Sequence, residues 1–424
     1  MSIDRRMSDN PLLDNVLRTM YKSAEMAGIY EDYLNILSQS EKKIEISIPI
    51  LMDDKTIKTF KGFIVQHSSV LGPSIGSINV VSDLGMDECE ALAMLMSLHT
   101  AVLDIPLGGS KGIIVANTKT MSSDEIERLY RAFVRIMIDL LGSNTNIIKL
   151  FENSSDYTSY PIIDTIEKRE KDIRTVVNRP GDYFGTGRIK KSQAVSIAQC
   201  IKKAVQTFSN KEINDVSIGL VLDENNIDID LLTELNGIGL NISGVSSGDN
   251  QNCCVCSQKI WDIILNHHWD FNHSVVVKRC EPYPISDEEN ILTADVDVLV
   301  LQNPNIRLNA SMAEKVKAKF VIEAEENCIT SDAEIILEDN GVIVVPDFIS
   351  LSGVLINAYI EWVYGASAII VGENEWKNAI TKLICQSLDK IWLAQKEYNV
   401  DSRTASSIVA MKKIVDIREK RGFN

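Results

Sequence analysis

Residues 216–222 read Val-Ser-Ile-Gly-Leu-Val-Leu, an almost unbroken apolar run that the polar residues Asp223-Glu224-Asn225-Asn226 follow at once. A short apolar run next to turn residues is typical of a strand that is covered on both faces of a parallel sheet. Four similar runs follow between helical segments, at residues 242–245, 296–301, 320–323 and 342–345. This alternation predicts a doubly wound α/β domain, so the fold class is α/β.

The N-terminal half has a different pattern. Four isoleucines alternate with other residues over 44–50, which predicts a half-buried strand, and Asp53-Asp54 turns the chain into a second strand near residues 60–65. Pro49 places the first strand at a sheet edge, because proline has no N–H to donate. Strands and helices of this kind predict an α+β domain ahead of the doubly wound one.

Several helices carry their own start signals. Asn10 can cap a helix that begins at Pro11, and Ser122 with Glu125 forms a capping box. The second of these helices is expected to bury Leu129, Phe133, Ile136 and Leu140 and to stop at Gly142. Further helices are predicted near residues 86–99, 359–363, 375–397 and 402–420.

The chain has 424 residues, and a single core stops growing at roughly 250–300 residues. We therefore expect an N-terminal domain over 1–185 for substrate and oligomerisation, a Rossmann-like domain over 186–350, and C-terminal helices over 351–424 that return to the first domain. The segment 178–188 is rich in glycine and turn residues, which favours a hinge over a phosphate loop, since it lacks the Gly-Lys-Ser/Thr signature.

Composition excludes several classes of protein. The chain is 45% hydrophobic and 24% charged, as in ordinary globular proteins, and its 59 acidic and 43 basic residues give a net charge of −16. Without a dense basic block, nucleic acid and anionic membrane are poor partners. The sequence has no secretory signal and no apolar stretch of roughly 18 residues, so we expect a cytoplasmic protein.

Local strings along nearly the whole chain resemble the glutamate dehydrogenase family, the group of glutamate, leucine, phenylalanine and valine dehydrogenases. The strings that carry the resemblance are Val65-Gln66-His67, Leu71-Gly72-Pro73, Ala91-Leu92-Ala93-Met94, Ile105-Pro106-Leu107-Gly108-Gly109-Ser110-Lys111-Gly112, Lys317-Ala318-Lys319, Val344-Val345-Pro346-Asp347 and Glu361-Trp362-Val363. The resemblance implies an oxidoreductase of amino acid metabolism: a hexamer that uses NAD or NADP for reversible oxidative deamination in a cleft between domains.

The resemblance implies that Lys111 is the catalytic lysine, but most of the family's other active-site residues are replaced in this chain. In the family's Gly-Pro-x-Lys-Gly-Gly string the carboxylate-binding lysine is replaced by Ile75, and a second lysine becomes His99. The proton-relaying acid of the Pro-x-Asp-x-Gly string aligns with Phe151, so Glu152, or Asp156, would have to replace it. Ala358 stands where a serine contacts the substrate side chain.

The cofactor positions that the resemblance implies are also altered. The three glycines of the dinucleotide turn become Leu220, Leu222 and Asn225, and Ser247 stands in place of the acid that binds the ribose. Near the nicotinamide, Glu326 and Leu351 replace two asparagines. Asp223 and Glu224 add negative charge where a pyrophosphate should bind, each a like-charge penalty of roughly 1–4 kcal/mol.

Eight cysteines are sparse for 424 residues, and only Cys253, Cys254 and Cys256 cluster, in a connection rich in Asn and Gln. His267, His268 and His273 downstream would supply further ligands for zinc, but the spacing matches no zinc framework, so we expect no metal site.

Three functions are compatible with these features of the sequence. The first is a glutamate dehydrogenase-like protein with impaired or lost activity and a regulatory or structural role in an oligomer, homomeric or shared with an active paralogue. The second is an active NAD(P)-dependent amino acid dehydrogenase with altered contacts. The third is a small-molecule sensor that uses the old cleft without turnover. The chain keeps the strings that pack the family's fold but has lost residues that would contact substrate and cofactor. This favours the first function, since function depends on the site and not on the fold.

Overall fold

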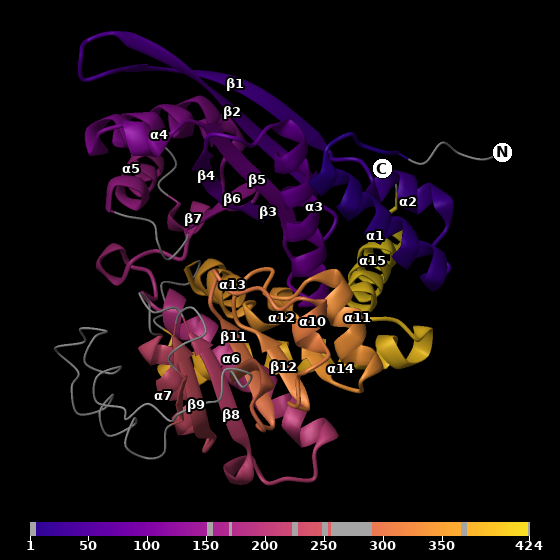
Figure 1. Ribbon diagram of the computed structural model, residues 1–424. Helices are drawn as coiled ribbons and strands as arrows, with labels where there is room; N and C mark the ends of the chain where they lie inside the picture. Colours follow the sequence, from indigo (N-terminus) through magenta and orange to yellow (C-terminus); the bar gives the residue numbers. More distant parts are fainter. Residues whose placement is uncertain are drawn as a thin grey trace. The chain divides into compact units, whose positions relative to one another are not determined.

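The computed structural model describes residues 6–150, 156–168, 172–222, 228–247, 253–255, 291–365 and 371–422 (Figure 1). The chain forms two compact units. The first consists of Met1–Ile189, Leu355–Trp376 and Lys390–Asn424, and the second of Lys190–Val354 and Lys377–Asp389. Helix α14 (Glu373–Tyr398) therefore gives its middle to the second unit and both ends to the first. None of the described helices is long and apolar enough to cross a membrane.

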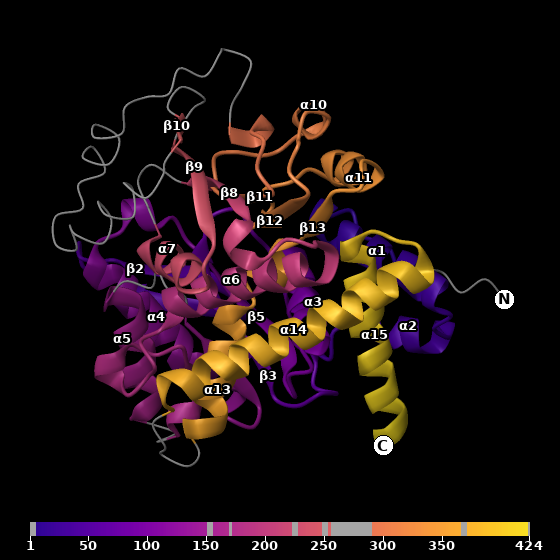
Figure 2. The same cartoon turned by 90° about the horizontal axis from the view of Figure 1, so that it is seen from below.

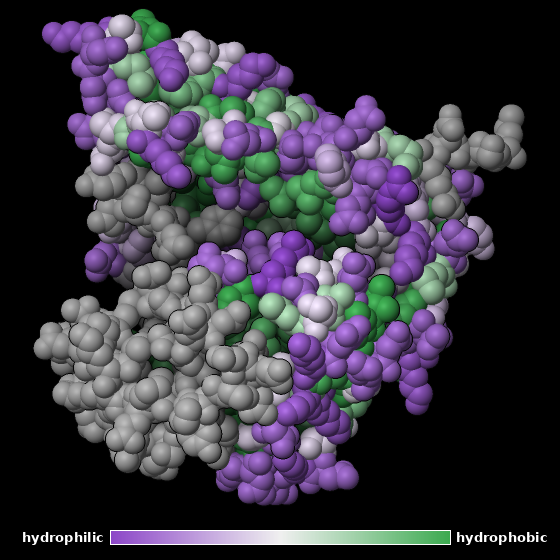
Figure 3. Space-filling view, viewed as in Figure 1, coloured by the Kyte–Doolittle hydropathy of each residue, from purple (hydrophilic) through white to green (hydrophobic). Residues whose placement is uncertain are grey.

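A mixed sheet forms the centre of the first unit. Its strands run in the order β1-β2-β5-β3-β6-β7, and β4 pairs with β5. Their bounds are β1 (Lys42–Leu51), β2 (Ile57–Ser68), β3 (Ser74–Gly76), β4 (Ile78–Val81), β5 (Gly108–Val115), β6 (Asn146–Lys149) and β7 (Val176–Val177). Among the described strands β1 pairs only with β2, so the edge position that Pro49 predicts is confirmed. The tip of this hairpin is hydrophilic (purple, upper left in Figure 3).

Helices cover the two faces of this sheet. The helices of the first unit are α1 (Pro11–Ala27), α2 (Glu31–Leu37), α3 (Met86–Val102), α4 (Ser123–Met137), α5 (Asp156–Glu167), most of α13 (Gly353–Gly365) and α15 (Ser402–Arg421). Ile114 and Ile148 pack with Phe133 of α4 and Ile163 of α5 on one face. On the other face α3 packs so closely that a Cβ on Gly109 would lie 2.2 Å from the backbone nitrogen of Ser97.

The predicted helix starts are confirmed, but one predicted buried residue is wrong. The Asn10 side chain accepts hydrogen bonds from the N–H groups of Leu12 and Leu13, and Ser122 with Glu125 forms the capping box. Ile136 is 44% exposed. The buried face of α4 consists of Leu129, Tyr130, Phe133, Val134 and Met137, so Ile136 lies at its margin, and the α-helix ends at Met137, before Gly142.

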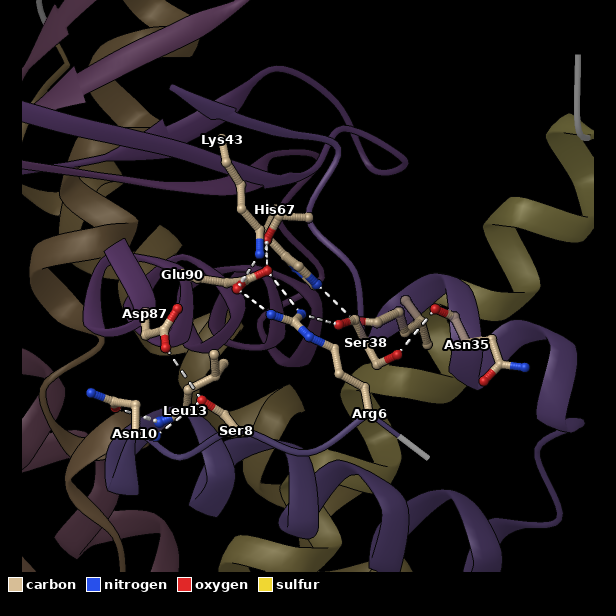
Figure 4. Close-up of polar contacts among 12 residues, drawn as sticks. Arg6, Ser8, Asn10, Leu13, Asn35, Ser38, Lys43, His67, Asp87 and Glu90 are labelled. Carbon is tan, nitrogen blue, oxygen red and sulfur yellow. Dashed lines mark hydrogen bonds and ion pairs between the residues drawn. The ribbon is translucent and has the colours of Figure 1, made fainter. Parts of the chain in front are cut away.

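The first described residues form ion pairs and hydrogen bonds with the start of α3 (Figure 4). Arg6 donates to both carboxylate oxygens of Glu90, at 2.9 and 2.5 Å, and Ser40 and Lys43 also donate to this fully buried carboxylate. The Asn10 amide donates to Glu88 at 2.6 Å. Burial opposes ionisation of Glu90, but these donors outweigh it and lower the pKa of the carboxyl.

The segment 178–188, the predicted hinge, lies wholly in the first unit, directly before its boundary at Ile189, and is bound to α13 through Glu361. The Glu361 carboxylate accepts hydrogen bonds from the Thr186 N–H at 2.8 Å, the Thr186 hydroxyl at 2.7 Å and the Arg179 N–H at 3.0 Å. Burial nevertheless raises the pKa of Glu361, while these hydrogen bonds act in the opposite direction.

The second unit contains a six-stranded sheet in the order β10-β9-β8-β11-β12-β13. Its strands are β8 (Ser217–Leu222), β9 (Asn241–Ser247), β10 (Cys253–Val255), β11 (Val298–Gln302), β12 (Phe320–Glu323) and β13 (Ile343–Val345). The five predicted strands are confirmed and pair in parallel. Cys253 and Cys254, which the sequence predicts to lie in a connection, instead belong to the edge strand β10, antiparallel to β9. A short apolar run such as Cys-Cys-Val can pair at the edge of a sheet.

Helices lie on both faces of this second sheet (Figure 2). The helices are α6 (Ile189–Phe208), α7 (Ile229–Gly237), α10 (Ala310–Ala313), α11 (Ser331–Asp339), α12 (Asp347–Ser350) and the middle of α14. Ala313 of α10 and Leu337 of α11 pack on Leu299 and Val321 of the sheet. An ion pair of 2.7 Å between Lys203 and Asp389 joins α6 to α14. This is a doubly wound α/β unit, as the sequence predicts.

Candidate functional site

Lys111 lies on β5, near the middle of the first unit's sheet, and only 9% of its surface is exposed. Its Nζ donates to the Ser77 hydroxyl at 2.7 Å and to the Asn79 side-chain oxygen at 3.0 Å. The Cys89 thiol of α3 donates to its carbonyl oxygen at 3.2 Å. Ser77 follows β3 and Asn79 belongs to β4, so two neighbouring segments fix the position of the ammonium group, while α3 contacts the Lys111 backbone.

Ile75 is fully buried on β3, between Gly109 of β5 and Ile147 of β6. This row of the sheet is therefore apolar where the family string would supply a cation. His99 is half-buried in the last turn of α3, and Ala358 is fully buried in α13. Phe151 and Glu152 lie outside the described residues, and the predicted role of Glu152 stays a prediction.

The carboxyl end of β8 is where a Rossmann-like unit would bind its cofactor. Leu220 lies inside β8, paired with Val245 and Val300, and Leu222 is the last residue of the strand. Both side chains are buried, at 0% and 2% exposure. Leu222 is therefore the last described residue at this end of β8, and Asp223, Glu224 and Asn225 lie outside the described residues.

Asp228 occupies the N-terminus of α7, the first helix after β8. Its side chain accepts a hydrogen bond from the Leu231 N–H at 2.9 Å and another from the Gln302 amide at 3.0 Å. The first contact satisfies the Leu231 N–H, one of the helix N-terminal groups that could otherwise bind a phosphate. Two residues further along, the pKa of Asp230 is raised, first by burial and then by the negative charge of Asp228.

The strand order of this sheet reverses between β8 and β11, and a Rossmann-type cofactor binds in the crevice at that point. Here two side chains at the end of β11 form hydrogen bonds to the neighbouring strand β8 and to the helix α7 that follows it. Asn303, which is 3% exposed, donates to the Leu222 carbonyl at 2.7 Å, and Gln302 donates to Asp228. These two hydrogen bonds tie the end of β11 to the end of β8 and to the N-terminus of α7.

Carboxylates also organise the loops after β12 and β13. The fully buried Glu323 accepts hydrogen bonds from the N–H groups of Ile329 at 3.0 Å and Asp347 at 3.1 Å. Asp347 in turn accepts from the Asn327 N–H at 2.9 Å. Acidic side chains therefore already accept backbone N–H groups of these loops.

The remaining cofactor positions are placed as follows. Ser247 is the last residue of β9 and is paired with Leu222, Glu326 is exposed between β12 and α11, and Leu351 ends the short helix α12. Of the residues proposed and set aside as zinc ligands, Cys256 and the three histidines lie outside the described residues. In the described part of the chain, no three His, Cys, Asp or Glu side chains are grouped to hold a metal ion.

Four residues of these two regions escaped the sequence reasoning: Ser77, Asn79, Lys149 and Asp228. A signal for Asp228 exists, since an acid directly before Ile229 is an ordinary N-cap. The other three are recognisable only from strand register, because Ser77 and Asn79 reach Lys111 from β3 and β4, and Lys149 ends β6, which pairs with β3.

These features define a class: two-unit α/β proteins in which a Rossmann-type sheet, with strand order 3-2-1-4-5-6, joins an α/β unit that carries a buried lysine. Residues 40–150 match the dimerisation domain of the Glu/Leu/Phe/Val dehydrogenases, and residues 196–422 match the glutamate/leucine/phenylalanine/valine dehydrogenase family. The chain belongs to the Glu/Leu/Phe/Val dehydrogenase family.

Curated relatives align end to end. The NADP-specific glutamate dehydrogenase of Saccharolobus shibatae is 28% identical over 100% of this chain and 99% of its own. The NAD-specific enzyme of Clostridioides difficile is 26% identical over 95% and 96%.

Solved structures share the fold. Glutamate dehydrogenase from Peptoniphilus asaccharolyticus has a TM-score of 0.85 at 24% identity and covers 98% of this chain and 100% of its own. The hetero-hexameric glutamate dehydrogenase of Thermus thermophilus, in a leucine-bound form, has a TM-score of 0.80 at 21% identity, over 99% of both chains.

Proposed function

We propose that this chain is a glutamate dehydrogenase-like protein whose dehydrogenase activity is impaired or lost and that it has a regulatory or structural role in a cytoplasmic oligomer. The observation that carries the proposal is Asp228 at the N-terminus of α7. A carboxylate that caps this helix occupies the N–H of Leu231 and repels a pyrophosphate at the same helix end. The residues present therefore do not fit NAD or NADP, and no hydride transfer is expected.

Two further observations support the proposal. At the strand-order reversal Asn303 donates to the Leu222 carbonyl and Gln302 donates to Asp228, so a dinucleotide that bound there would compete with these hydrogen bonds. Ile75 is fully buried in an apolar row of the other unit, and an aliphatic side chain cannot bind the carboxylate of an amino acid. Each loss alone is tolerable, but the cofactor and the substrate positions are altered together.

The oligomeric part of the proposal rests on the preserved framework. The dimerisation-domain match covers residues 40–150, and one structural neighbour is a hetero-hexameric glutamate dehydrogenase. By analogy we propose a hexamer, either of this chain alone or with an active paralogue.

An active NAD(P)-dependent amino acid dehydrogenase is the alternative, and Lys111 is the observation that favours it. The lysine is kept, nearly buried and held at its Nζ by Ser77 and Asn79, which is a plausible setting for a catalytic amine. In that case the acid would have to come from Glu152 or from Asp156.

Turnover assays on the purified full chain distinguish the two. We expect no change in absorbance at 340 nm with NAD or NADP and a panel that includes glutamate, leucine, phenylalanine and valine. Lys111→Ala is the matched control, because any trace activity that survives this substitution comes from a contaminant. Lys111-dependent turnover on any of these amino acids would reject the proposal in favour of the alternative.

A further inference from the structure

A small cavity lies within the first unit, where the C-terminal ends of α2, β2 and α15 come together. Its volume is about 50 Å³, whereas a single water needs only about 10–15 Å³, so several non-hydrogen atoms fit. Lys111 is not among the residues that line it. Four apolar and two polar residues supply most of the wall: Ile36, Val70, Ile414 and Val415, with His67 and Ser68.

An irregularity in β2 explains why two consecutive residues of this strand line one cavity. Successive side chains of a regular strand point to opposite faces of the sheet. Against β5, however, the pairing shifts between Gln66 and Ser68, which leaves His67 as an extra residue. A bulge of this kind re-aims a side chain, and bulges are common beside functional sites. The bulge therefore brings an imidazole and a hydroxyl to the same cavity.

The His67 ring has a nitrogen whose lone pair is not used. Its Nε2 lies 2.8 Å from the Leu37 carbonyl oxygen, which can only accept, so Nε2 carries the hydrogen. Burial lowers the pKa of the ring, which is therefore neutral, and Nδ1 is an acceptor. The ring is 1% exposed, and its Nδ1 has no hydrogen-bond partner in the described part of the chain. Buried acceptors of this kind are rare unless a water or a ligand satisfies them.

The two polar groups together select a hydroxyl group. An O–H can donate to Nδ1 of His67 and also accept from the Ser68 hydroxyl, which itself accepts the Val70 N–H at 3.4 Å. A carboxylate cannot donate, and an ammonium cannot accept and would lose its hydration beside a neutral ring. Glu41 and Arg418 also line the cavity, and their opposite charges favour neither an anion nor a cation. The apolar walls favour a hydrocarbon chain on the hydroxyl.

We propose that this cavity binds a small neutral alcohol, with its hydroxyl bonded to His67 and Ser68 and its hydrocarbon chain against Ile36 and Val415. Ile36 is 39% exposed and Val415 is half-buried, so both offer surface to a ligand. The hydroxyl is the only part of the ligand that has to reach the buried ring. The inference goes beyond the proposed function, because the site shares no residue with the altered substrate and cofactor positions.

Saturation-transfer difference NMR on the full chain tests the site with 1-butanol and its isomer diethyl ether. The two probes contain the same atoms, but the ether has no O–H to donate. We expect saturable binding of 1-butanol that is roughly fivefold or more tighter than binding of the ether, which is the effect of one hydrogen bond. Butylammonium and butyrate, titrated in parallel, should both bind more weakly than 1-butanol.

Variants separate the polar groups from the apolar wall. His67→Gln can keep the bond to the Leu37 carbonyl through its amide but has no acceptor in place of Nδ1, so it should weaken binding of 1-butanol roughly fivefold. Ser68→Ala should also weaken it, whereas Ser69→Ala, at an exposed neighbour, is the matched control and should have no effect. Val415→Phe fills the cavity and should abolish binding without any change to His67.

A further measurement uses the wild-type chain. With ¹⁵N-labelled histidine, the Nδ1 signal of His67, assigned by its loss in His67→Gln, should shift when 1-butanol is added and stay in place with diethyl ether. The inference is wrong if 1-butanol does not bind saturably or does not shift this signal, if the ether or a charged probe binds as tightly, or if Val415→Phe binds as wild type does. Dinucleotide binding would instead reject the proposed function and leave this result unaffected.

Discussion

The Asp228 carboxylate accepts a hydrogen bond from the Leu231 N–H, so an acid caps the helix that follows the first strand of the Rossmann-type sheet. In a dinucleotide-binding unit this helix end faces the pyrophosphate. The cap stabilises the helix, and under the proposed function it also opposes the cofactor, because the Leu231 N–H that bonds Asp228 is not available to a phosphate.

The cap can be tested by substitution. Asp228→Ala should lower the free energy of unfolding by about 1 kcal/mol, as is usual for loss of an N-cap. Asp228→Asn is the matched variant, since asparagine caps equally well without the charge, and it should stay within about 0.5 kcal/mol of wild type. Urea denaturation followed by circular dichroism measures both. Equal stability of the alanine and asparagine variants would show that the cap does not form.

Much of the framework was predictable from local sequence. The five parallel strands, the α1 cap at Asn10 and the capping box at Ser122 each follow from residues close together in the chain, where periodicity and capping determine the outcome. The buried face of α4 was predicted less well, because Ile136 sits at the margin of the apolar stripe, and packing against the sheet decides which margin residues are covered.

The polar surroundings of the sites were not predictable in the same way. Ser77 reaches Lys111 because the strand order places β3 beside β5, from which it is distant in sequence. Gln302 reaches Asp228 across 74 residues. Such contacts depend on strand order and register, and local patterns of hydrophobicity do not contain either.

A second prediction concerns the ion pair that fastens the N-terminal segment to α3. Arg6→Met should lower the free energy of unfolding by about 2 kcal/mol, less than the roughly 3–5 kcal/mol typical of a broken buried pair, because Lys43 remains beside Glu90. The double variant Arg6→Met/Glu90→Met removes both charges and should recover part of the loss. A double-mutant cycle in urea measures the coupling; additive effects would contradict a direct interaction.

A third prediction addresses the lost substrate cation. Ile75→Lys should destabilise the first unit by about 3 kcal/mol or more, because it buries a charge next to Ile147 and close to Lys111. It should also fail to produce dehydrogenase activity. Ile75→Met is the volume-matched control and should cost less than about 1.5 kcal/mol. Thermal unfolding and the 340 nm assay give the two readouts, and activity gained by Ile75→Lys would contradict the account.

A fourth prediction concerns pH. Burial raises the pKa of Glu361 in the folded chain above its unfolded value of about 4.3, so the folded state binds this proton more tightly. The stability that this proton contributes is complete below pH 4.3 and is lost as the pH rises through the folded pKa. Relative to Glu361→Gln, which cannot titrate, the wild-type free energy of unfolding should therefore decline above about pH 4.3. A constant difference between pH 4 and 8 would show that the pKa is not raised.

The central claim, that this Rossmann-type unit does not bind a dinucleotide, is tested most directly by titrating the full chain with NADH and with NADPH and following nucleotide fluorescence. We predict no saturable change up to about 1 mM, a limit that corresponds to binding weaker than roughly 4 kcal/mol. Saturable binding with a Kd in the micromolar range, for either nucleotide, would contradict the account.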